Sequence, residues 1–414
     1  MTFAQSRASP VEARFSYAPC PQDDDELMTR SQKTILSLLS LFACSTIAVG
    51  AWLWQGQWDQ PLGPALQIPS ATPFELPATW TPDPDAIATL QAVPTSAPVL
   101  LASPLPTFTP QLGLCGAPPV MNILAIGADT RGDNYNYGLA DVIRLVRVDF
   151  VNPKVSVLEI PRDLWVEIPD IADDLNGQDH EKLNQAYLYG NPGFGYTDDP
   201  ARGPGLLART LALNFGTQID HYAAVNMRTF EKIVNAVGGI DVTLPETVDG
   251  RTATDTNKRL LFPAGTHHLD GTRALTLARV RIEGGFARAD NQNRVLCALR
   301  DKLTSPGVIP KIPELIRSFQ DAILTDLSPE QLGQLACIGT QIPSGNIVFA
   351  SFPSEHFKLT RQYDPVFKNT VSVWDVNFDV IRSYVSLFQN GAWPSEETEP
   401  SDSASEDSGG VVCP

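Results

Sequence analysis

Residues 120–126 read VMNILAI, and two further runs rich in β-branched side chains follow, DVIRLVRVDF at 141–150 and VSVLEI at 155–160. Gly127 ends the first run, and Asn152-Pro153 separates the second run from the third. Short apolar runs bounded by turn residues predict buried strands. The three runs therefore predict the start of a central sheet.

Helical periodicity dominates the later part of the chain. The Gly238-Gly239 pair suits the C-terminal end of one of the predicted helices. Strands mixed with helices predict a layered domain of the α/β or α+β class. The spacing of apolar residues predicts helices at 206–215, 227–237, 271–281, 290–303, 313–324, 328–339 and 373–388, and strands at 240–244 and 346–352.

The segment 34–54 contains 21 residues without a charge, which as a helix span about 31 Å, the thickness of the hydrocarbon core of a bilayer. It predicts a transmembrane helix, and a cleaved signal peptide is the alternative. Four basic residues precede the segment, and no Lys or Arg follows before Arg131. The positive-inside rule therefore places residues 1–33 in the cytoplasm and the rest of this single-pass protein outside the cell membrane.

The flanking segments differ in composition from the domain. Residues 55–119 contain 14 prolines among Thr, Ser and Ala, which predicts an extended extracytoplasmic stalk. Residues 391–414 are acidic and poor in apolar side chains, which predicts a disordered tail. One domain remains, at about 120–390.

Charge and motifs exclude several classes of function. The chain has a formal net charge of −17, with 30 Lys and Arg against 47 Asp and Glu, so a nucleic-acid-binding surface is not expected. The six cysteines form no CxxC pair and no zinc-site spacing with histidine. The G-x-S-x-G, GxxxxGK[ST] and G-x-G-x-x-G motifs are absent from their required contexts.

Carboxylates and arginines concentrate where predicted strands and helices end. Asp129 and Arg131 follow the first strand, Asp141 opens the second, and Arg162 follows the third. The polar loop between the first two strands brings Asp129 and Asp141 to neighbouring strand ends. Further basic and amide side chains, Arg279, Arg281, Arg288 and Gln292, lie in one helix–loop–helix segment. Each residue alone has an ordinary explanation as a turn former or a solvated side chain.

Together these blocks resemble the catalytic domain of the LytR-CpsA-Psr family. The resemblance rests on MNILAIGADTRGDNYNYGLADVIRLVRVDF and VSVLEIPRDLWVEIPD, then EKLNQAYLYG, NAVGGIDVTLP and FPAGTHHLDGTRALTLARVRIEGGFARADNQNRVLCAL, in the family's order over about 120–300. It implies an α/β/α sandwich around a central mixed sheet, with a hydrophobic tunnel for a lipid. It also implies a phosphotransferase that moves a glycopolymer from a polyprenyl pyrophosphate carrier to a hydroxyl of a cell-wall or envelope acceptor, with pyrophosphatase activity when water is the acceptor.

The resemblance also implies roles for individual residues. Asp129 and Asp141 match two magnesium-binding aspartates, and the arginines that hold the pyrophosphate match Arg162, Arg279, Arg281 and Arg288. Gln292 matches a head-group contact, and Arg131 and Lys182 match positions that are commonly basic. Two aspartates suit Mg²⁺, which completes its shell with water and substrate phosphate. Forked guanidinium donors suit a pyrophosphate drawn against an apolar tunnel.

The chain departs from the family pattern at three places. Leu139 stands where an arginine is common before the second aspartate, and Asn291 stands where a further arginine is frequent. Ile282-Glu283 replaces the usual His-Asp pair, and Arg144 is a candidate substitute for the missing guanidinium. The alternative function is therefore a non-catalytic polyprenyl-lipid-binding or regulatory envelope protein.

Two local geometries can also be predicted. Arg279 and Arg281 share a face only if the backbone is extended there, so the helix from Gly271 is expected to end at or before Arg279. Four cysteines lie outside the membrane in the predicted topology, where thiols oxidise. The expected disulfides are Cys297–Cys337 and Cys115–Cys413, and buried free thiols are the alternative.

Overall fold

The computed structural model divides the chain into two compact units, Met1–Gln57 and Trp58–Pro414. It describes residues 31, 34–35, 38–41, 45, 59–68, 113–130, 132, 134–252, 254, 257–280, 285–319, 322–365, 368–394 and 411–413, and for 285–288, 316–317 and 411–412 it describes the backbone alone. In the first unit, the described residues between 31 and 45 are helical. The predicted membrane segment 34–54 otherwise lies outside the described residues. Among the helices of the described residues, none is long and apolar enough to span a bilayer.

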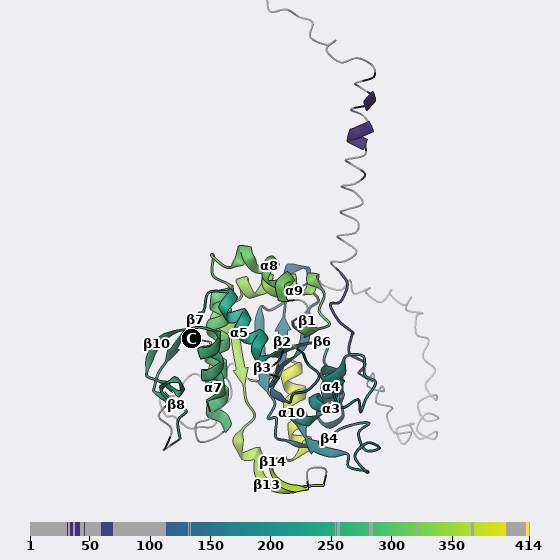
Figure 1. Ribbon diagram of the computed structural model, residues 1–414, viewed down its shortest axis with the longest axis vertical. Helices are drawn as coiled ribbons and strands as arrows, with labels where there is room; N and C mark the ends of the chain where they lie inside the picture. The colour runs from purple at the N-terminus through teal and green to yellow at the C-terminus, as the bar shows by residue number, and fades with distance from the viewer. Residues whose placement is uncertain are drawn as a thin grey trace, which may run out of the picture. The chain divides into compact units, whose positions relative to one another are not determined.

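The second unit is built on a mixed sheet of seven strands in the order β11-β6-β1-β2-β3-β12-β15 (Figure 1). Strand β1 pairs antiparallel with β2 and parallel with β6, and β3 pairs antiparallel with β2 and parallel with β12. The strands of the sheet are β1 (Val120–Ala128), β2 (Ala140–Asp149), β3 (Lys154–Glu159), β6 (His221–Asn226), β11 (Leu324–Thr325), β12 (Ile347–Ala350) and β15 (Val411–Val412). The predicted central mixed sheet and its first three strands are confirmed.

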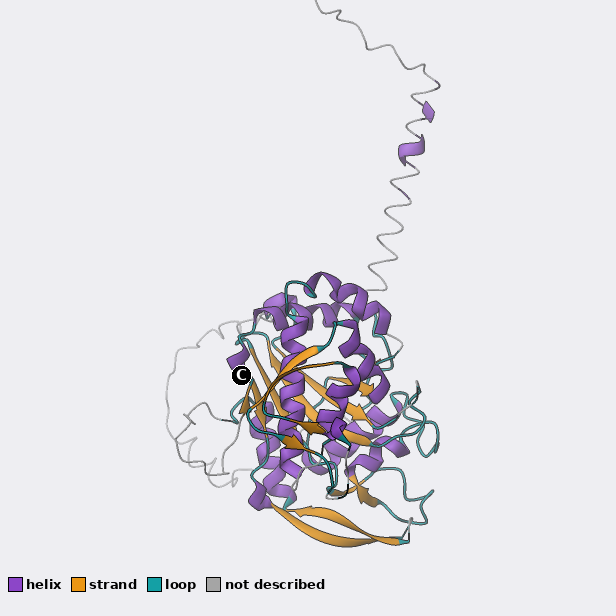
Figure 2. Ribbon diagram, turned by 60° about the vertical axis from the view of Figure 1, so that its left-hand side comes forward, coloured by secondary structure: helices purple, strands orange, loops and turns teal. Residues whose placement is uncertain are grey.

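Helices cover both faces of the sheet. The larger helices of the second unit are α3 (Leu183–Tyr189), α4 (Arg202–Phe215), α5 (Met227–Ala236), α6 (Gly271–Arg279), α7 (Gly285–Leu303), α8 (Ile312–Phe319), α9 (Pro329–Gln341) and α10 (Phe378–Gln389). Side chains alternate between the faces along β1, so Leu124 and Ile126 pack with α3, α4 and α10, whereas Met121 and Ile123 pack with α7 and α9. Figure 2 shows the strands enclosed between these helices.

Smaller sheets extend the two ends of the domain. One group of buried residues joins α5, α6 and α7 to β7 (Ile240–Leu244), β8 (Val248–Asp249), β9 (Leu261–Phe262) and β10 (Gly265–Leu269). At the other end, β4 (Trp165–Glu167) pairs with β5 (His180–Lys182), and β13 (Phe357–Asp364) pairs with β14 (Asn369–Val376) in the long hairpin at the bottom of Figures 1 and 2. The predicted helix over 373–388 is wrong in its first turn, because 373–376 belong to β14 and the helix begins at Phe378.

Four cysteines are paired, but not as the sequence predicted. The disulfides are Cys115–Cys337 and Cys297–Cys413, so the expected pairs Cys297–Cys337 and Cys115–Cys413 are wrong. The strand β15 at 411–412 pairs with β12 at the sheet edge and brings Cys413 against α7. The sheet therefore fixes the end of the chain, which composition alone assigned to a disordered tail.

Part of the segment assigned to the stalk packs on the domain. Residues 59–68 have no regular secondary structure, and Leu66 and Ile68 contact the main hydrophobic core. The amide of Leu62 donates to the carbonyl of Leu327 (3.2 Å), and the Tyr222 hydroxyl donates to the carbonyl of Pro64 (3.1 Å). This decapeptide is thus part of the folded unit.

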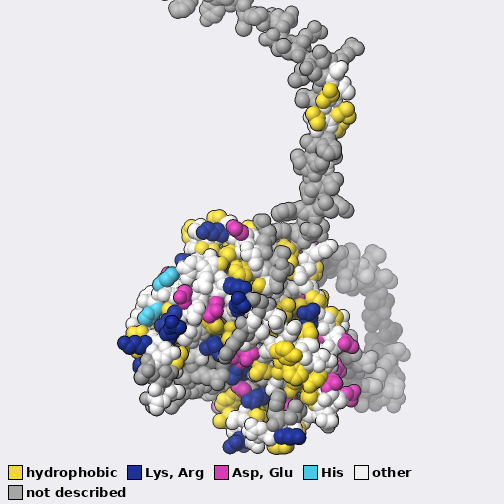
Figure 3. All heavy atoms as spheres, in the orientation of Figure 1, with side chains coloured by type: hydrophobic (Ala, Val, Ile, Leu, Met, Phe, Trp, Pro, Cys, Tyr) yellow, Lys and Arg dark blue, Asp and Glu magenta, His cyan; other side chains and the backbone are white. Residues whose placement is uncertain are grey.

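On the face drawn in Figure 3, Lys and Arg side chains are interspersed with Asp and Glu. No continuous basic surface is visible on that face, in agreement with the charge composition. Such a mixed surface offers a phosphate backbone little net attraction.

Candidate active site

The loop between β1 and β2 carries the first aspartate and is tightly fastened. The Asp129 amide donates to the carbonyl of Leu139 (3.0 Å), and the Leu139 amide donates to Asp129 Oδ1 (2.7 Å). The buried Tyr135 hydroxyl donates to the carbonyl of Ala322 (2.7 Å) and accepts from the amide of Asn226 (3.1 Å). These bonds hold the Asp129 carboxylate at the end of β1.

Glycine is required beside this carboxylate. Gly138 has φ +132°, which L side chains rarely adopt. A Cβ at this position would collide with Thr130 Oγ1 and would lie 3.2 Å from Asp129 Oδ1. Close packing of the loop on Asp129 therefore depends on Gly138.

The second aspartate stands at an irregularity in the sheet. In the β1–β2 ladder Gly127 pairs with Val142 and Ala128 pairs with Ala140, so Asp141 is an extra residue without an opposite partner. Such a bulge bends the strand and redirects a side chain, and bulges are common beside active sites. It places Asp141 at the same end of the sheet as Asp129, as the sequence predicted.

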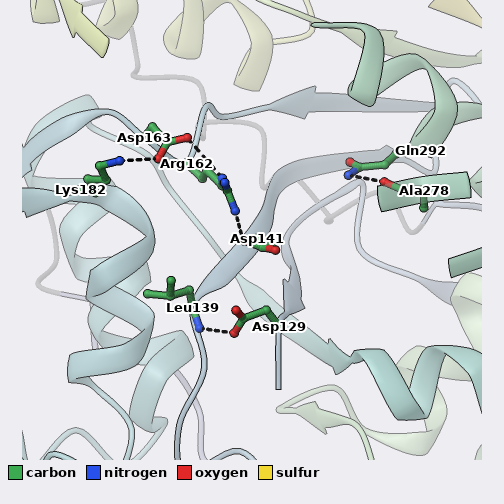
Figure 4. A network of polar contacts seen from close by, with 8 residues as sticks. All are labelled: Asp129, Leu139, Asp141, Arg162, Asp163, Lys182, Ala278 and Gln292. Atoms are coloured by element: carbon green, nitrogen blue, oxygen red, sulfur yellow. Dashed lines mark hydrogen bonds and ion pairs between the residues drawn. The ribbon is translucent and has the colours of Figure 1, made fainter. Parts of the chain in front are cut away.

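A series of ion pairs links Asp141 to the segment that follows β3 and to strand β5 (Figure 4). Arg162 donates to the Asp141 carboxylate through Nη1, and its Nε lies 3.3 Å from Asp163 Oδ2. Lys182, the last residue of β5, donates from Nζ to Asp163 Oδ1 at 3.0 Å. The exposed fractions of the four side chains range from 17% to 32%, so a ligand can reach these ion pairs from solvent.

The helix α6 ends at the position that the spacing of Arg279 and Arg281 predicted. The helix ends at Arg279, and Val280 is extended with φ −58° and ψ 127°. Arg279 is exposed, and its side chain makes no hydrogen bond or ion pair with another residue that the structure describes. Arg131 and Arg281 lie outside the described residues, as does the side chain of Arg288, so their roles stay predictions.

Gln292 is buried, with 7% of its surface exposed, and joins three elements. Its Nε2 donates to the carbonyl of Ala278, next to Arg279, at 3.3 Å (Figure 4). Its Oε1 accepts from Arg144 of β2 at 3.2 Å, and the adjacent Asn293 Oδ1 accepts from the same guanidinium at 2.6 Å. Gln292 thus holds the C-terminal end of α6 against the strand that carries Asp141.

Arg144 is committed to this interior network. Only 2% of its surface is exposed, and its guanidinium also lies 3.6 Å from Glu159 Oε2 and over the ring of Phe349. Burial lowers the pKa of Arg144, and the Glu159 carboxylate opposes that shift. The buried guanidinium is already bound, so Arg144 does not take the place of the arginine that Leu139 replaces.

The donors at this end of the sheet fit a magnesium ion that a phosphate helps to bind. Among the described residues no group of three or more His, Cys, Asp or Glu side chains is placed to hold a metal alone. Mg²⁺ commonly uses one or two carboxylates together with substrate phosphate and water. Asp129 and Asp141 could supply those two carboxylates.

Some features of this site escaped the sequence analysis. Asp163 was given no role, although it adjoins Arg162 and joins that guanidinium to Lys182. The anchoring role of Tyr135 gave no signal in the sequence, because its partners lie up to 187 positions away. The one local signal for Asp163 was its position directly after Arg162 in the run VSVLEIPRDLWVEIPD.

Comparisons with known proteins identify relatives of this chain. A profile described as the LytR_cpsA_psr family matches residues 116–380. The polyisoprenyl-teichoic acid–peptidoglycan teichoic acid transferase TagV of Bacillus subtilis is 31% identical over 209 residues, which are 50% of this chain and 49% of TagV. The transferase TagU of Oceanobacillus iheyensis is 31% identical over 52% of this chain and 61% of TagU. Regulatory protein MsrR of Staphylococcus aureus is 29% identical over 51% of this chain and 59% of MsrR.

The matches to these relatives thus span about half to three-fifths of their length. Among solved structures, Bacillus subtilis TagV has a TM-score of 0.50 at 24% identity, covering 66% of this chain and 97% of that one. A Streptococcus agalactiae protein has a TM-score of 0.51 at 19% identity, covering 66% and 88%. At these identities the structural likeness concerns the fold.

Proposed function

The chain belongs to the LytR_cpsA_psr family, and from that premise we propose that it is a membrane-anchored phosphotransferase. Its donor is a glycopolymer on a polyprenyl pyrophosphate, and its acceptor is a hydroxyl of the cell wall or envelope. The observation that carries the proposal is the meeting of Asp129, Asp141 and Arg162 at one end of the sheet, in a chain whose relatives TagV and TagU are named as transferases.

Charge balance supports the need for further cations. Asp129, Asp141 and Asp163 carry three negative charges, and Arg162 and Lys182 carry two positive ones. A pyrophosphate would meet a net negative site unless a divalent cation and further guanidiniums joined it. Arg279 at the end of α6 supplies one, and we expect Arg131, Arg281 and Arg288 to supply others.

Asp129 and Asp141 are the residues that would hold Mg²⁺, which polarises the phosphates when it is bound. The protein contributes by exchanging one ion pair of Arg162 for another. Arg162 now neutralises Asp141, and in the donor complex its planar donors turn to phosphate oxygens, where they stabilise charge that grows in the transition state. Asp163 keeps Lys182 beside Arg162 throughout.

Phosphoryl transfer also needs a base for the attacking hydroxyl. The acceptor oxygen forms a bond to the phosphorus next to the glycan, and the bond from that phosphorus to the bridging oxygen breaks. Polyprenyl phosphate leaves, and either Asp129 or Asp141 takes the hydroxyl proton. Water in place of the acceptor gives hydrolysis of the donor at the same site.

We also propose that 34–54 is the membrane anchor and that the second unit lies outside the cytoplasm. The two disulfides support this location, because disulfides persist chiefly in oxidising compartments. A donor that resides in the membrane needs an enzyme held close to it.

The competing function is a non-catalytic lipid binder or regulator. Two observations favour it: Leu139 stands where the family commonly has an arginine, and the relative MsrR is named a regulatory protein. The test uses the full chain in detergent, because Leu66 and Ile68, which precede the predicted catalytic domain, pack against its core. It is given a polyprenyl pyrophosphate-linked saccharide, MgCl₂ and peptidoglycan. We expect saccharide transfer that falls at least about a hundredfold in Asp141→Asn and persists in the exposed control Asp375→Asn. Binding without turnover in the wild type would establish the competing function.

A further inference from the structure

Two loops, the one after Asp129 and the one before α4, each present an aromatic ring to solvent. Tyr137 is 58% exposed and Phe194 is 41% exposed, with their ring centroids 5.9 Å apart in an edge-to-face arrangement. Phe194 also packs on Tyr189 and Tyr196, with centroid distances of 5.9 and 5.4 Å. We call Tyr137 and Phe194 the aromatic platform.

The platform is fixed in place by its surroundings. The Gly193 amide donates to the carbonyl of Asn136 at 3.1 Å, which ties the loop before α4 to the loop before β2. A Cβ on Gly193 would collide with the Asn136 carbonyl and with the ring of Tyr137. Tyr189 is buried and supports Phe194 from below. Two exposed rings held this firmly need little ordering when they bind a ligand.

The platform adjoins the candidate active site. Tyr137 lies two residues before Leu139, whose amide is 2.7 Å from Asp129 Oδ1, and two residues span at most about 7 Å. The backbone of Tyr137 is therefore within about 10 Å of the Asp129 carboxylate. Thr130 Oγ1, in the residue after Asp129, also donates to the carbonyl of Tyr137, so a hydrogen bond joins the Tyr137 end of the platform to the segment that carries Asp129.

We propose that the aromatic platform binds a sugar ring of the acceptor glycan, an inference that rests on the proposed function. The C–H groups on one face of a pyranose carry partial positive charge and stack on the electron-rich face of an aromatic ring. The same two loops carry the exposed polar residues Asn134, Asn136 and Asp198, which we call the polar rim and which suit sugar hydroxyl and amide groups. A polyprenyl chain is the other candidate occupant, but an open surface with this polar rim leaves such a chain in water.

Binding can be tested without turnover. The probe is a soluble tetramer of β-1,4-linked N-acetylglucosamine, titrated by calorimetry against the full chain in detergent. We expect Tyr137→Ala and Phe194→Ala each to weaken binding by about tenfold, and Tyr137→Phe to keep it, because the ring face remains. The matched control is Tyr363→Ala, because Tyr363 is 61% exposed on the β13–β14 hairpin. This variant should bind the tetramer as tightly as the wild type does.

Kinetics provide a second readout. With peptidoglycan fragments as acceptor, Tyr137→Ala should raise the acceptor KM by about tenfold while kcat at saturating acceptor changes by less than about twofold. Unchanged tetramer binding in both alanine variants overturns the proposal, as does a wild type that fails to bind the tetramer. The proposal is also overturned if the two alanine variants lose binding of farnesyl pyrophosphate but keep binding of the tetramer. Donor consumption by the wild type in water is measured separately, so failure of the proposed function is distinguishable from failure of the platform.

Discussion

Arg144 offers the sharpest test of how the candidate site is held together. Its side chain is 3% exposed, and its guanidinium donates to Asn293 Oδ1 at 2.6 Å and to Gln292 Oε1 at 3.2 Å. Replacement with methionine keeps much of the side-chain volume but removes both donors. The two amide oxygens then lose the charged donor that joins β2 to α7.

The expected cost follows from these contacts. Each buried amide oxygen left without a donor costs about 1–3 kcal/mol. Methionine avoids the cost of burying a cation, which offsets part of this loss. We therefore expect Arg144→Met to lower the free energy of unfolding by about 2–4 kcal/mol. The exposed pair Arg251–Asp249, 2.7 Å apart, provides the control, and Arg251→Met should cost no more than about 1 kcal/mol.

The assay is urea unfolding of the full chain in detergent, monitored by tryptophan fluorescence. A cycle with Asn293→Ala should reveal a coupling of about 1 kcal/mol, because either substitution alone already breaks the shortest bond. Strict additivity, or a loss below about 0.5 kcal/mol for Arg144→Met, would refute the role assigned to this network.

Three further outcomes are expected. Gly138→Ala, at φ +132°, should lower stability by about 1–3 kcal/mol and reduce donor turnover; a melting temperature and turnover equal to the wild type would contradict this. Replacing both cysteines of the Cys297–Cys413 disulfide with serine should cost about 4–5 kcal/mol on the chain-entropy model, since 116 positions separate them; an unchanged urea midpoint would contradict that figure. Burial raises the pKa of Glu181 from 4.5 to about 8, so the folded protein retains a proton there that the unfolded chain has released, and the resulting stability is complete below pH 4.5 and lost as the pH rises to about 8. Glu181→Gln should flatten this decline in the urea midpoint, whereas the exposed control Glu355→Gln should leave it unchanged.

Local sequence patterns predicted the central strands of the sheet. They failed for elements whose structure depends on contacts with distant parts of the chain. The runs at 120–126, 141–150 and 155–160 became β1 to β3, because a strand buried on both faces reads as a continuous apolar run. The strand β6 (HYAAVN) gave no such signal, since its buried and half-buried residues alternate and His221 begins it. The last four residues of β14, 373–376, were predicted as helix because its apolar residues run directly into those of α10.

In the candidate site, too, local patterns predicted some features, whereas others depend on distant contacts. Asp129, Asp141 and Arg162 were predicted together. The pairing of β1 with β2 puts Asp129 and Asp141 at neighbouring strand ends, and Arg162 forms an ion pair with Asp141, whereas their roles stay predictions. The disulfide partners were wrong because pairing depends on where β15 joins the sheet, and a two-residue strand after an acidic segment has no periodicity to reveal it. Burial of Gln292 likewise depends on Arg144, 148 positions away.

The identity of the lipid product tests the central claim most directly. The full chain is incubated with a polyprenyl pyrophosphate-linked saccharide, Mg²⁺ and peptidoglycan. The lipids are then extracted, and their molecular masses are measured by mass spectrometry. Attack on the phosphorus next to the glycan predicts polyprenyl monophosphate, with one phosphate retained on the transferred saccharide. Polyprenyl pyrophosphate as the product would mean attack on the sugar carbon, and it would contradict the assignment of Asp129, Asp141 and Arg162 to phosphoryl transfer.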